Sequence, residues 1–317
     1  MLQSSQWQGV PIIVMENDHL EVSLVPSINN NVYRIYDKTL RRDVLLAPDS
    51  PQQLQERPIY SGTPILMPPN RIRHGKFTFD GRTYQLDCNW PDGNHIHGVL
   101  GALPWEVVEQ HSRDGVDTVI SRFRIADHPE VFRQYPHELT LEVEYRLTGS
   151  TLVHTLRAVN DSNTPAPFGY GLHTWFLLDH QPQQWTLTMP VDGIWELDDE
   201  NIPTDRILPL DGRLAGLSDG ISLQHLDLDT VFRVGANAPL AALRSPDCEI
   251  RYSGSDLIKH WVIYTQGEAD NVICLEPYTW VTNAPNSSLP AAETGLIAIA
   301  PGERVELDIT LEIIYQS

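Results

Sequence analysis

The sequence predicts an all-β protein, a large antiparallel β-sandwich that forms a single domain over residues 1–317. Three observations support this fold class. Apolar and polar residues alternate with a period of two in several stretches, turn residues stand between those stretches, and no stretch shows three turns of helical periodicity. Many short strands with regular turn signals are typical of a sandwich, and all-β chains of this length occur as one domain.

Three stretches show the alternation most clearly. Near the N-terminus, Leu20, Val22 and Leu24 alternate with polar residues. Residues 141–146 read Leu-Glu-Val-Glu-Tyr-Arg, and residues 304–313 alternate in the same way. Because successive side chains of a strand point to opposite faces, each stretch has one apolar and one polar face. We therefore expect half-buried antiparallel strands at all three places.

Turn signals connect the expected strands. Asp80-Gly81, a pair that readily takes positive φ angles, stands between residues 76–79 and 83–86 and predicts a hairpin. Thr148-Gly149-Ser150 links the strand at 141 to another expected over residues 152–159. The 24 prolines and 20 glycines are scattered between strands and mark loops. A short helical piece is expected near residues 52–55.

Composition excludes several classes of partner. The net charge is −20 without any cluster of Lys and Arg, so neither nucleic acid nor an anionic membrane is expected to bind. No apolar run reaches membrane-spanning length, and the first residues lack the pattern of a signal peptide. Cys88, Cys248 and Cys274 do not suggest a disulfide framework or a zinc site, which fits a reducing cytoplasm. The expected partner is a small neutral molecule; nothing firm follows about oligomeric state.

Two of four unusual polar segments lie before residue 100. Pro68 to Gly75 includes Arg71, which could donate paired hydrogen bonds to vicinal hydroxyls or a carboxylate, although a solvated loop arginine is the favoured interpretation of this segment alone. In Asn94-His95-Ile96-His97-Gly98, an extended chain would put His95 and His97 on one face. Such a pair can ligate metal in cupins, but the further glutamate and histidine are not at cupin spacing.

The other two segments combine a candidate acid and a candidate base. In Gly169-Tyr170-Gly171-Leu172-His173-Thr174-Trp175, a strand would place His173 beside two glycines, which leave space, and beside a flat indole. Such a face suits a sugar, and a hydrogen-bonded core histidine is an equally good interpretation. Glu276 ends the apolar run Val272-Ile273-Cys274-Leu275, where desolvation should raise its pKa toward that of a useful base. Cys274 is expected to be a buried thiol.

Taken in order, these segments resemble the aldose 1-epimerase (galactose mutarotase-like) family. The segment Pro69-Asn70-Arg71-Ile72 is similar to its Asn-Arg-Ile stretch, and Asn94-His95-Ile96-His97-Gly98 to its Asn-His-x-His-Gly motif. Gly171-Leu172-His173-Thr174-Trp175-Phe176 resembles its His-x-Tyr/Trp-Phe motif, and Cys274-Leu275-Glu276-Pro277 its Glu-Pro motif. The resemblance runs from about residue 10 to the C-terminus. No single motif is highly specific, but four in order make a strong case.

The resemblance implies a β-supersandwich and a mutarotase that needs neither metal nor cofactor. His173 would protonate the ring oxygen of a sugar, and Glu276 would remove the proton from the C1 hydroxyl. For His173 to be protonated near neutral pH, its pKa should be raised, and a nearby anionic Glu276 or Asp229 would favour the imidazolium. His97 would help to hold the ring oxygen, and the substrate-binding residues would be Asn70, Arg71, Trp175 and Asp229. Asp229 lies in Leu228-Asp229-Thr230-Val231-Phe232, which resembles the family's aspartate before an aromatic residue, and Asp227 is a near competitor.

Some residues depart from the family pattern. Only one glycine follows His97, and Val262 stands where galactose mutarotases have a glutamine; both departures count against galactose. Gly98-Val99-Leu100-Gly101-Ala102 lacks the arginine of the hexose-phosphate branch, which favours an unphosphorylated sugar. Three alternatives stay open: a non-catalytic carbohydrate-binding β-sandwich, an epimerase of a phosphorylated or otherwise modified sugar, and a cupin-like metalloenzyme that uses His95, His97 and His173.

Overall fold

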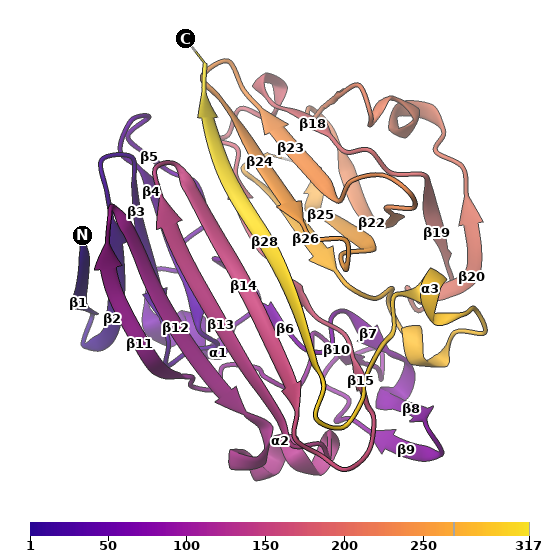
Figure 1. The fold of residues 1–317 in the computed structure, drawn as a ribbon. Helices are drawn as coiled ribbons and strands as arrows, with labels where there is room; N and C mark the ends of the chain where they lie inside the picture. The colour runs from indigo at the N-terminus through magenta and orange to yellow at the C-terminus, as the bar shows by residue number, and fades with distance from the viewer. Residues whose placement is uncertain (269, 317) are drawn as a thin grey trace.

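The computed structural model describes residues 1–268 and 270–316, and it confirms an antiparallel β-sandwich (Figure 1). One layer is a nine-stranded sheet. Its strands are, in spatial order, β11 (Glu106–Arg113), β12 (Val116–Arg124), β13 (Leu139–Thr148), β14 (Thr151–Asn160), β28 (Arg304–Tyr315), β24 (Cys248–Gly254), β23 (Leu240–Arg244), β18 (Thr186–Thr188) and β21 (Ile221–Ser222).

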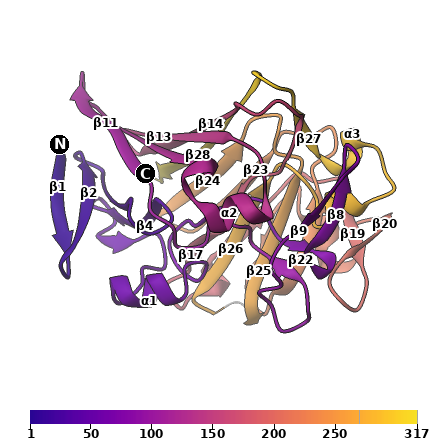
Figure 2. The same ribbon diagram turned by 90° about the horizontal axis from the view of Figure 1, so that it is seen from below.

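Two further sheets form the opposite layer, which Figure 2 shows from the edge. The first has β1 (Leu2–Trp7), β2 (Val10–Glu16), β3 (Leu20–Val25), β4 (Asn31–Asp37) and β5 (Arg42–Asp43). The second runs β20 (Pro203–Leu208), β19 (Gly193–Leu197), β22 (Asp227–Arg233), β25 (His260–Glu268), β26 (Val272–Tyr278), β16 (Gly171–Leu172) and β6 (Ile65–Leu66), with β17 (Thr174–Leu177) also paired to β26.

Short elements complete the fold. Three strand pairs are β7 (Arg71–Ile72) with β10 (His95–Ile96), β8 (Lys76–Phe79) with β9 (Arg82–Gln85), and β15 (Ala166–Phe168) with β27 (Ile297–Ile299). The helices are α1 (Pro51–Glu56), α2 (Pro129–Gln134), α3 (Ala291–Thr294) and single 3₁₀ turns at Arg73–Gly75, Ile125–Asp127, Pro182–Gln184, Gly212–Gly216 and Ala284–Asn286. Within residues 1–268 and 270–316, none of the helices has the length and apolar character needed to cross a lipid bilayer.

The predicted strands and turns are confirmed. The alternating stretches at 20, 141 and 304 lie in β3, β13 and β28, and their apolar side chains are buried except for Val305, which is half-buried. Asp80 and Gly81 have φ angles of 46° and 76°, the left-handed geometry that closes the β8–β9 hairpin. The helical piece near residue 52 is α1, whose first turn is capped by the Ser50 side chain.

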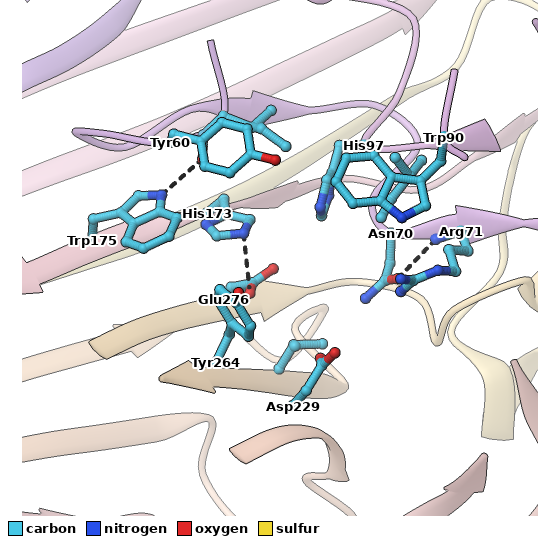
Figure 3. A pocket seen from close by; sticks show the side chains of 13 residues that line it. Tyr60, Asn70, Arg71, Trp90, His97, His173, Trp175, Asp229, Tyr264 and Glu276 are labelled. Carbon is cyan, nitrogen blue, oxygen red and sulfur yellow. Dashed lines mark hydrogen bonds and ion pairs between the residues drawn. The ribbon is translucent and has the colours of Figure 1, made fainter. Parts of the chain in front are cut away.

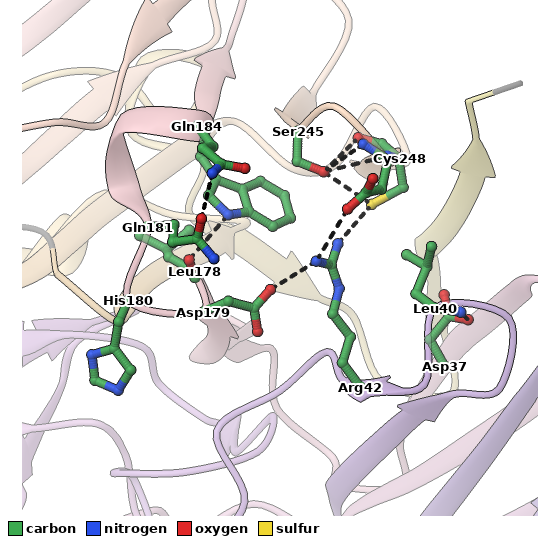
Figure 4. A network of polar contacts seen from close by, with 12 residues as sticks. Asp37, Leu40, Arg42, Leu178, Asp179, His180, Gln181, Gln184, Ser245 and Cys248 are labelled. Atoms are coloured by element: carbon green, nitrogen blue, oxygen red, sulfur yellow. Dashed lines mark hydrogen bonds and ion pairs between the residues drawn. The ribbon is translucent and has the colours of Figure 1, made fainter.

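One apolar cluster fills the space between the layers and draws side chains from all three large sheets. Cys274 is fully buried, as expected. A polar network at one end of the sandwich joins the two sheets of one layer to the nine-stranded sheet (Figure 4). In it, Arg42 of β5 donates to Asp179, 2.8 Å away in the loop after β17, and to the Cys248 thiol of β24 at 3.4 Å.

Candidate active site

A cavity lies where the eight-stranded sheet meets the β7–β10 pair, and its open space, including the part that opens to solvent, is about 570 Å³ (Figure 3). The three residues expected to be catalytic, His97, His173 and Glu276, all line it. So do the four residues expected to bind substrate, which are Asn70, Arg71, Trp175 and Asp229. The fold therefore brings together side chains that are more than 200 positions apart in the sequence.

Strand register places one group of these residues on the sheet. In the antiparallel ladder β22–β25–β26, Asp229 pairs with Tyr264, and Val262 pairs with Glu276. Val262 and Tyr264 are two positions apart on β25, so their side chains share a face of the sheet. Glu276 and Asp229, which pair with them, therefore lie on that same face. A register shift separates Asp227 from Asp229, and Asp229 but not Asp227 reaches the cavity.

The β7–β10 pair supplies the opposite wall. Asn70 and His97 both have left-handed backbone, with φ angles of 56° and 60°, and the His97 amide donates to the Asn70 carbonyl at 3.0 Å. Arg71 follows Asn70, and its Nε donates to the Asp92 carboxylate at 3.2 Å. The guanidinium is thus held by a carboxylate while it still lines the cavity.

The left-handed geometry at His97 overturns the expectation that His95 and His97 share a face. That expectation required extended backbone, which His97 does not have. The His95 ring is buried instead, with its Nδ1 2.7 Å from the Asp87 carbonyl oxygen, and His95 does not line the cavity. In the part of the chain that the structure describes, no group of three or more His, Cys, Asp or Glu side chains is arranged to hold a metal ion.

His173 and Glu276 meet in the cavity wall. The His173 Nε2 lies 3.3 Å from the Glu276 Oε1, and both residues are buried, at 5% and 1% exposure. The other carboxyl oxygen, Oε2, accepts a hydrogen bond from the Tyr278 hydroxyl. The His97 ring stands edge-on to the His173 ring, with their centroids 5.1 Å apart.

Burial sets the ionisation of this pair. It lowers the pKa of His173 to about 3, which is opposite to the raised value expected from the sequence. It raises the pKa of Glu276 well above the ordinary 4.5, and the nearby charge of Asp229 adds to this increase. The sequence expectation failed because desolvation of the imidazolium outweighs its attraction to a carboxylate. Burial thus favours the uncharged form of both groups, the neutral imidazole of His173 and the carboxylic acid of Glu276.

Trp175 is packed differently from the exposed platform that the sequence suggested. It is 2% exposed, its ring stacks on His173 at 5.1 Å, and its Nε1 donates to the Ile59 carbonyl at 2.8 Å. The expected open space beside two glycines is also occupied. A Cβ atom at Gly169 would lie 2.2 Å from the Trp280 ring, and one at Gly171 would lie 2.2 Å from the Tyr278 ring.

Three aromatic residues of the site were missed by sequence reasoning. Tyr60, Trp90 and Tyr264 all line the cavity, and each is partly exposed there. Tyr60 and Trp90 lie in irregular segments, where no periodicity shows the direction of a side chain. The one available signal was the position of Trp90 just before the Asn94 motif, in a turn that also supplies Asp92.

Comparison with known proteins gives consistent matches. The family model described as aldose 1-epimerase matches residues 31–312. Galactose mutarotase of Rattus norvegicus is 32% identical over 181 residues, which are 55% of this chain and 49% of that protein. Galactose mutarotase of Sus scrofa is 29% identical over 228 residues (67% of this chain, 62% of that protein). Aldose 1-epimerase of Escherichia coli K12 is 29% identical over 178 residues, or 54% of this chain and 49% of that protein.

Solved structures share the fold over the full length. A galactose mutarotase-like protein from Clostridium acetobutylicum superposes with a TM-score of 0.94 at 23% identity, covering 100% of this chain and 99% of the other. Galactose 1-epimerase from Lactobacillus acidophilus has a TM-score of 0.80 at 20% identity, with 100% of both chains covered. The sequence alignments, by contrast, span only about half to three-fifths of the relatives' own length.

Proposed function

Because this chain belongs to the aldose 1-epimerase family, we propose that it is an isomerase that interconverts the α and β anomers of a free aldose. The buried contact between His173 and Glu276 in the wall of a cavity lined by polar and aromatic side chains is the observation that carries the proposal. A pure binding module has no need for a buried acid and base in contact, because burying ionisable groups without a use is costly.

The proposed reaction needs one base and one acid. Glu276 takes the proton of the C1 hydroxyl while His173 gives a proton to the ring oxygen, so the C1–O bond of the ring breaks and an open-chain aldehyde forms. Rotation of the aldehyde and the reverse transfers close the ring with the other configuration. His97, whose ring lies beside that of His173, helps to hold the ring oxygen. Each proton transfer is worth roughly 10²–10⁴-fold in rate.

The charges around the cavity favour a neutral sugar. Asp229 and Glu276 are acidic, and Arg71 is already paired with Asp92. A phosphate would therefore meet two acidic side chains and one arginine that is already paired, so no free positive charge in the cavity lining would compensate it. Asn70, Arg71 and Asp229 offer hydrogen bonds to hydroxyl groups, and Trp90 offers a partly exposed ring for the C–H face of a sugar.

Val262 provides an argument about which aldose the protein prefers. It lines the cavity in register with Glu276, so an apolar side chain faces the sugar where galactose mutarotases have a glutamine. We therefore propose an aldose other than galactose as the preferred substrate. A cytoplasmic location remains a prediction from the sequence.

The proposal is tested by polarimetry on fresh solutions of single anomers of several aldoses, galactose included, with protein that was dialysed against a chelator. We expect faster mutarotation of at least one aldose without added metal. Loss of activity after chelation that a divalent ion restores would contradict the acid–base mechanism. Binding of a sugar without any acceleration across the panel would instead identify a binding module.

A further inference from the structure

The segment Gly169-Tyr170-Gly171 contains two glycines that pack closely against aromatic rings. Neither glycine has left-handed backbone, so conformational freedom is not what requires it. Space is the remaining reason, because Cβ atoms essentially never approach another heavy atom as closely as 2.2 Å. Gly171 pairs with Tyr278 across the β16–β26 ladder, and the Tyr278 ring lies over the glycine.

The room at Gly171 lets the Tyr278 ring reach the candidate base. Tyr278 is two residues after Glu276 on β26, on the same face of the sheet, and it is fully buried. Its hydroxyl donates to the Glu276 Oε2, whereas the Oε1 faces His173. Both oxygens of the carboxyl group therefore have a partner, and the two contacts fix its orientation.

We propose that Tyr278 is a positioning residue for the Glu276 base, and that Gly171 is small so that the Tyr278 ring can hold that carboxylate; this inference rests on the proposed function. A hydroxyl that donates to a carboxylate stabilises the charged form. It opposes the burial and the Asp229 charge, which both favour the protonated acid. Without Tyr278, the proton shared with His173 would reside on Glu276 for a larger fraction of the time, and the reactive form would be rarer.

Gly169 offers a matched comparison. A Cβ atom there would meet Trp280 at the same 2.2 Å. The Trp280 Nε1 donates to the Pro69 carbonyl at 3.2 Å, directly before Asn70, so this ring supports the substrate-binding wall rather than the base. The two glycines thus admit two aromatic rings that hold opposite walls of one cavity.

The test is Tyr278→Phe, studied by the pH dependence of kcat/KM and by the titration of the Glu276 carboxyl carbon in isotope-labelled protein without sugar. The lost hydrogen bond to an anion should raise both the alkaline limb and the carboxyl titration by about one to two pH units. The plateau value of kcat should fall about 10- to 100-fold, and KM should change little. Tyr170→Phe is the control, because it removes an equally buried hydroxyl that contacts His154 and not Glu276.

Two glycine variants check the spatial argument. Gly171→Ala should move the alkaline limb as Tyr278→Phe does, whereas Gly169→Ala should raise KM and leave the limb in place. A folded Tyr278→Phe protein with an unchanged carboxyl titration would overturn the inference, as would a loss of kcat without any movement of the limb. The two proposals can fail separately. If Tyr278→Phe shifts the Glu276 carboxyl titration but the unmodified protein anomerises no aldose, the proposed function is overturned and the link between Tyr278 and Glu276 is supported.

Discussion

The Nε2 of His173 and the Oε1 of Glu276 are 3.3 Å apart, and both side chains are almost completely shielded from solvent. At this distance, transfer of one proton from the carboxyl group to the imidazole would turn a neutral pair into the ionic pair that the proposed reaction requires. The transfer changes neither the net charge nor the number of protons bound. In the proposed mechanism the reactive form is therefore a tautomer of the neutral pair, and it does not depend on uptake of a proton from water.

A wide pH plateau is the first consequence. Burial pushes the two pKa values apart, because it lowers that of His173 to about 3 and raises that of Glu276. Entry of a second proton at His173 should set the acid limb of kcat/KM, and loss of the shared proton from Glu276 should set the alkaline limb. Initial mutarotation rates between about pH 4 and pH 9, corrected for the buffer-catalysed reaction, measure this. A narrow optimum between the ordinary values of about 4.3 and 6.5 would contradict it.

Removal of either partner should abolish most of the catalysis. Glu276→Gln keeps the shape of the side chain but removes the base, so kcat should fall about 10²-fold or more with little change in sugar binding. His173→Asn should also lower kcat, and the double variant should be little worse than the poorer single variant, because each residue depends on the other. Glu306→Gln, at an exposed glutamate paired with Arg157, serves as the control. Near-normal kcat in Glu276→Gln would end this mechanism.

The two neighbouring aspartates should behave differently. Asp229 lines the cavity and Asp227 does not, although they are two residues apart in β22. Loss of a hydrogen bond from the Asp229 carboxylate to a hydroxyl should raise KM roughly tenfold in Asp229→Ala. Asp227→Ala is the matched control and should keep its KM. If only the Asp227 variant binds sugar weakly, the assignment moves to that residue.

Buried histidines should make the fold sensitive to acid. Burial lowers the pKa of His154, His173 and His260 to about 3, so each stays neutral in the folded state. The unfolded chain takes up protons at these residues below about pH 6.5, so stability should fall as pH decreases from about 6.5 toward 3. Each residue contributes a slope of about 1.4 kcal/mol per pH unit.

His154→Gln isolates one of these contributions away from the cavity. Urea unfolding at several pH values should show a slope smaller by one histidine's share, and His74→Asn, at an exposed left-handed position, serves as the control. Equal slopes for His154→Gln and the unmodified protein would show that His154 is not kept neutral by folding.

Local patterns in the sequence determined much of this protein. The alternation in residues 141–146 and 304–313 predicts β13 and β28 because the period of side chains along a strand does not depend on distant residues. Asp80-Gly81 predicts its hairpin because a tight turn needs positive φ at adjacent positions. Six of the seven candidate site residues were predicted from four motifs in a known order and Asp229 from a separate segment, and all seven line one cavity.

Only the tertiary structure decided how these residues are arranged and how deeply they are buried. The separation of His173 and Glu276 follows from the pairing of β17 with β26, two strands about 100 residues apart, and no local pattern specifies that distance. The sign of each pKa shift depends on how much water the surrounding side chains exclude, which the sequence does not show. The sequence-based expectation that the pKa of His173 is raised was therefore wrong. The glycines at 169 and 171 suggested vacant space because the sequence shows only their neighbours along the chain. The Tyr278 ring that fills part of that space comes from β26 and the Trp280 ring from the segment just after it, and only the folded chain brings them near.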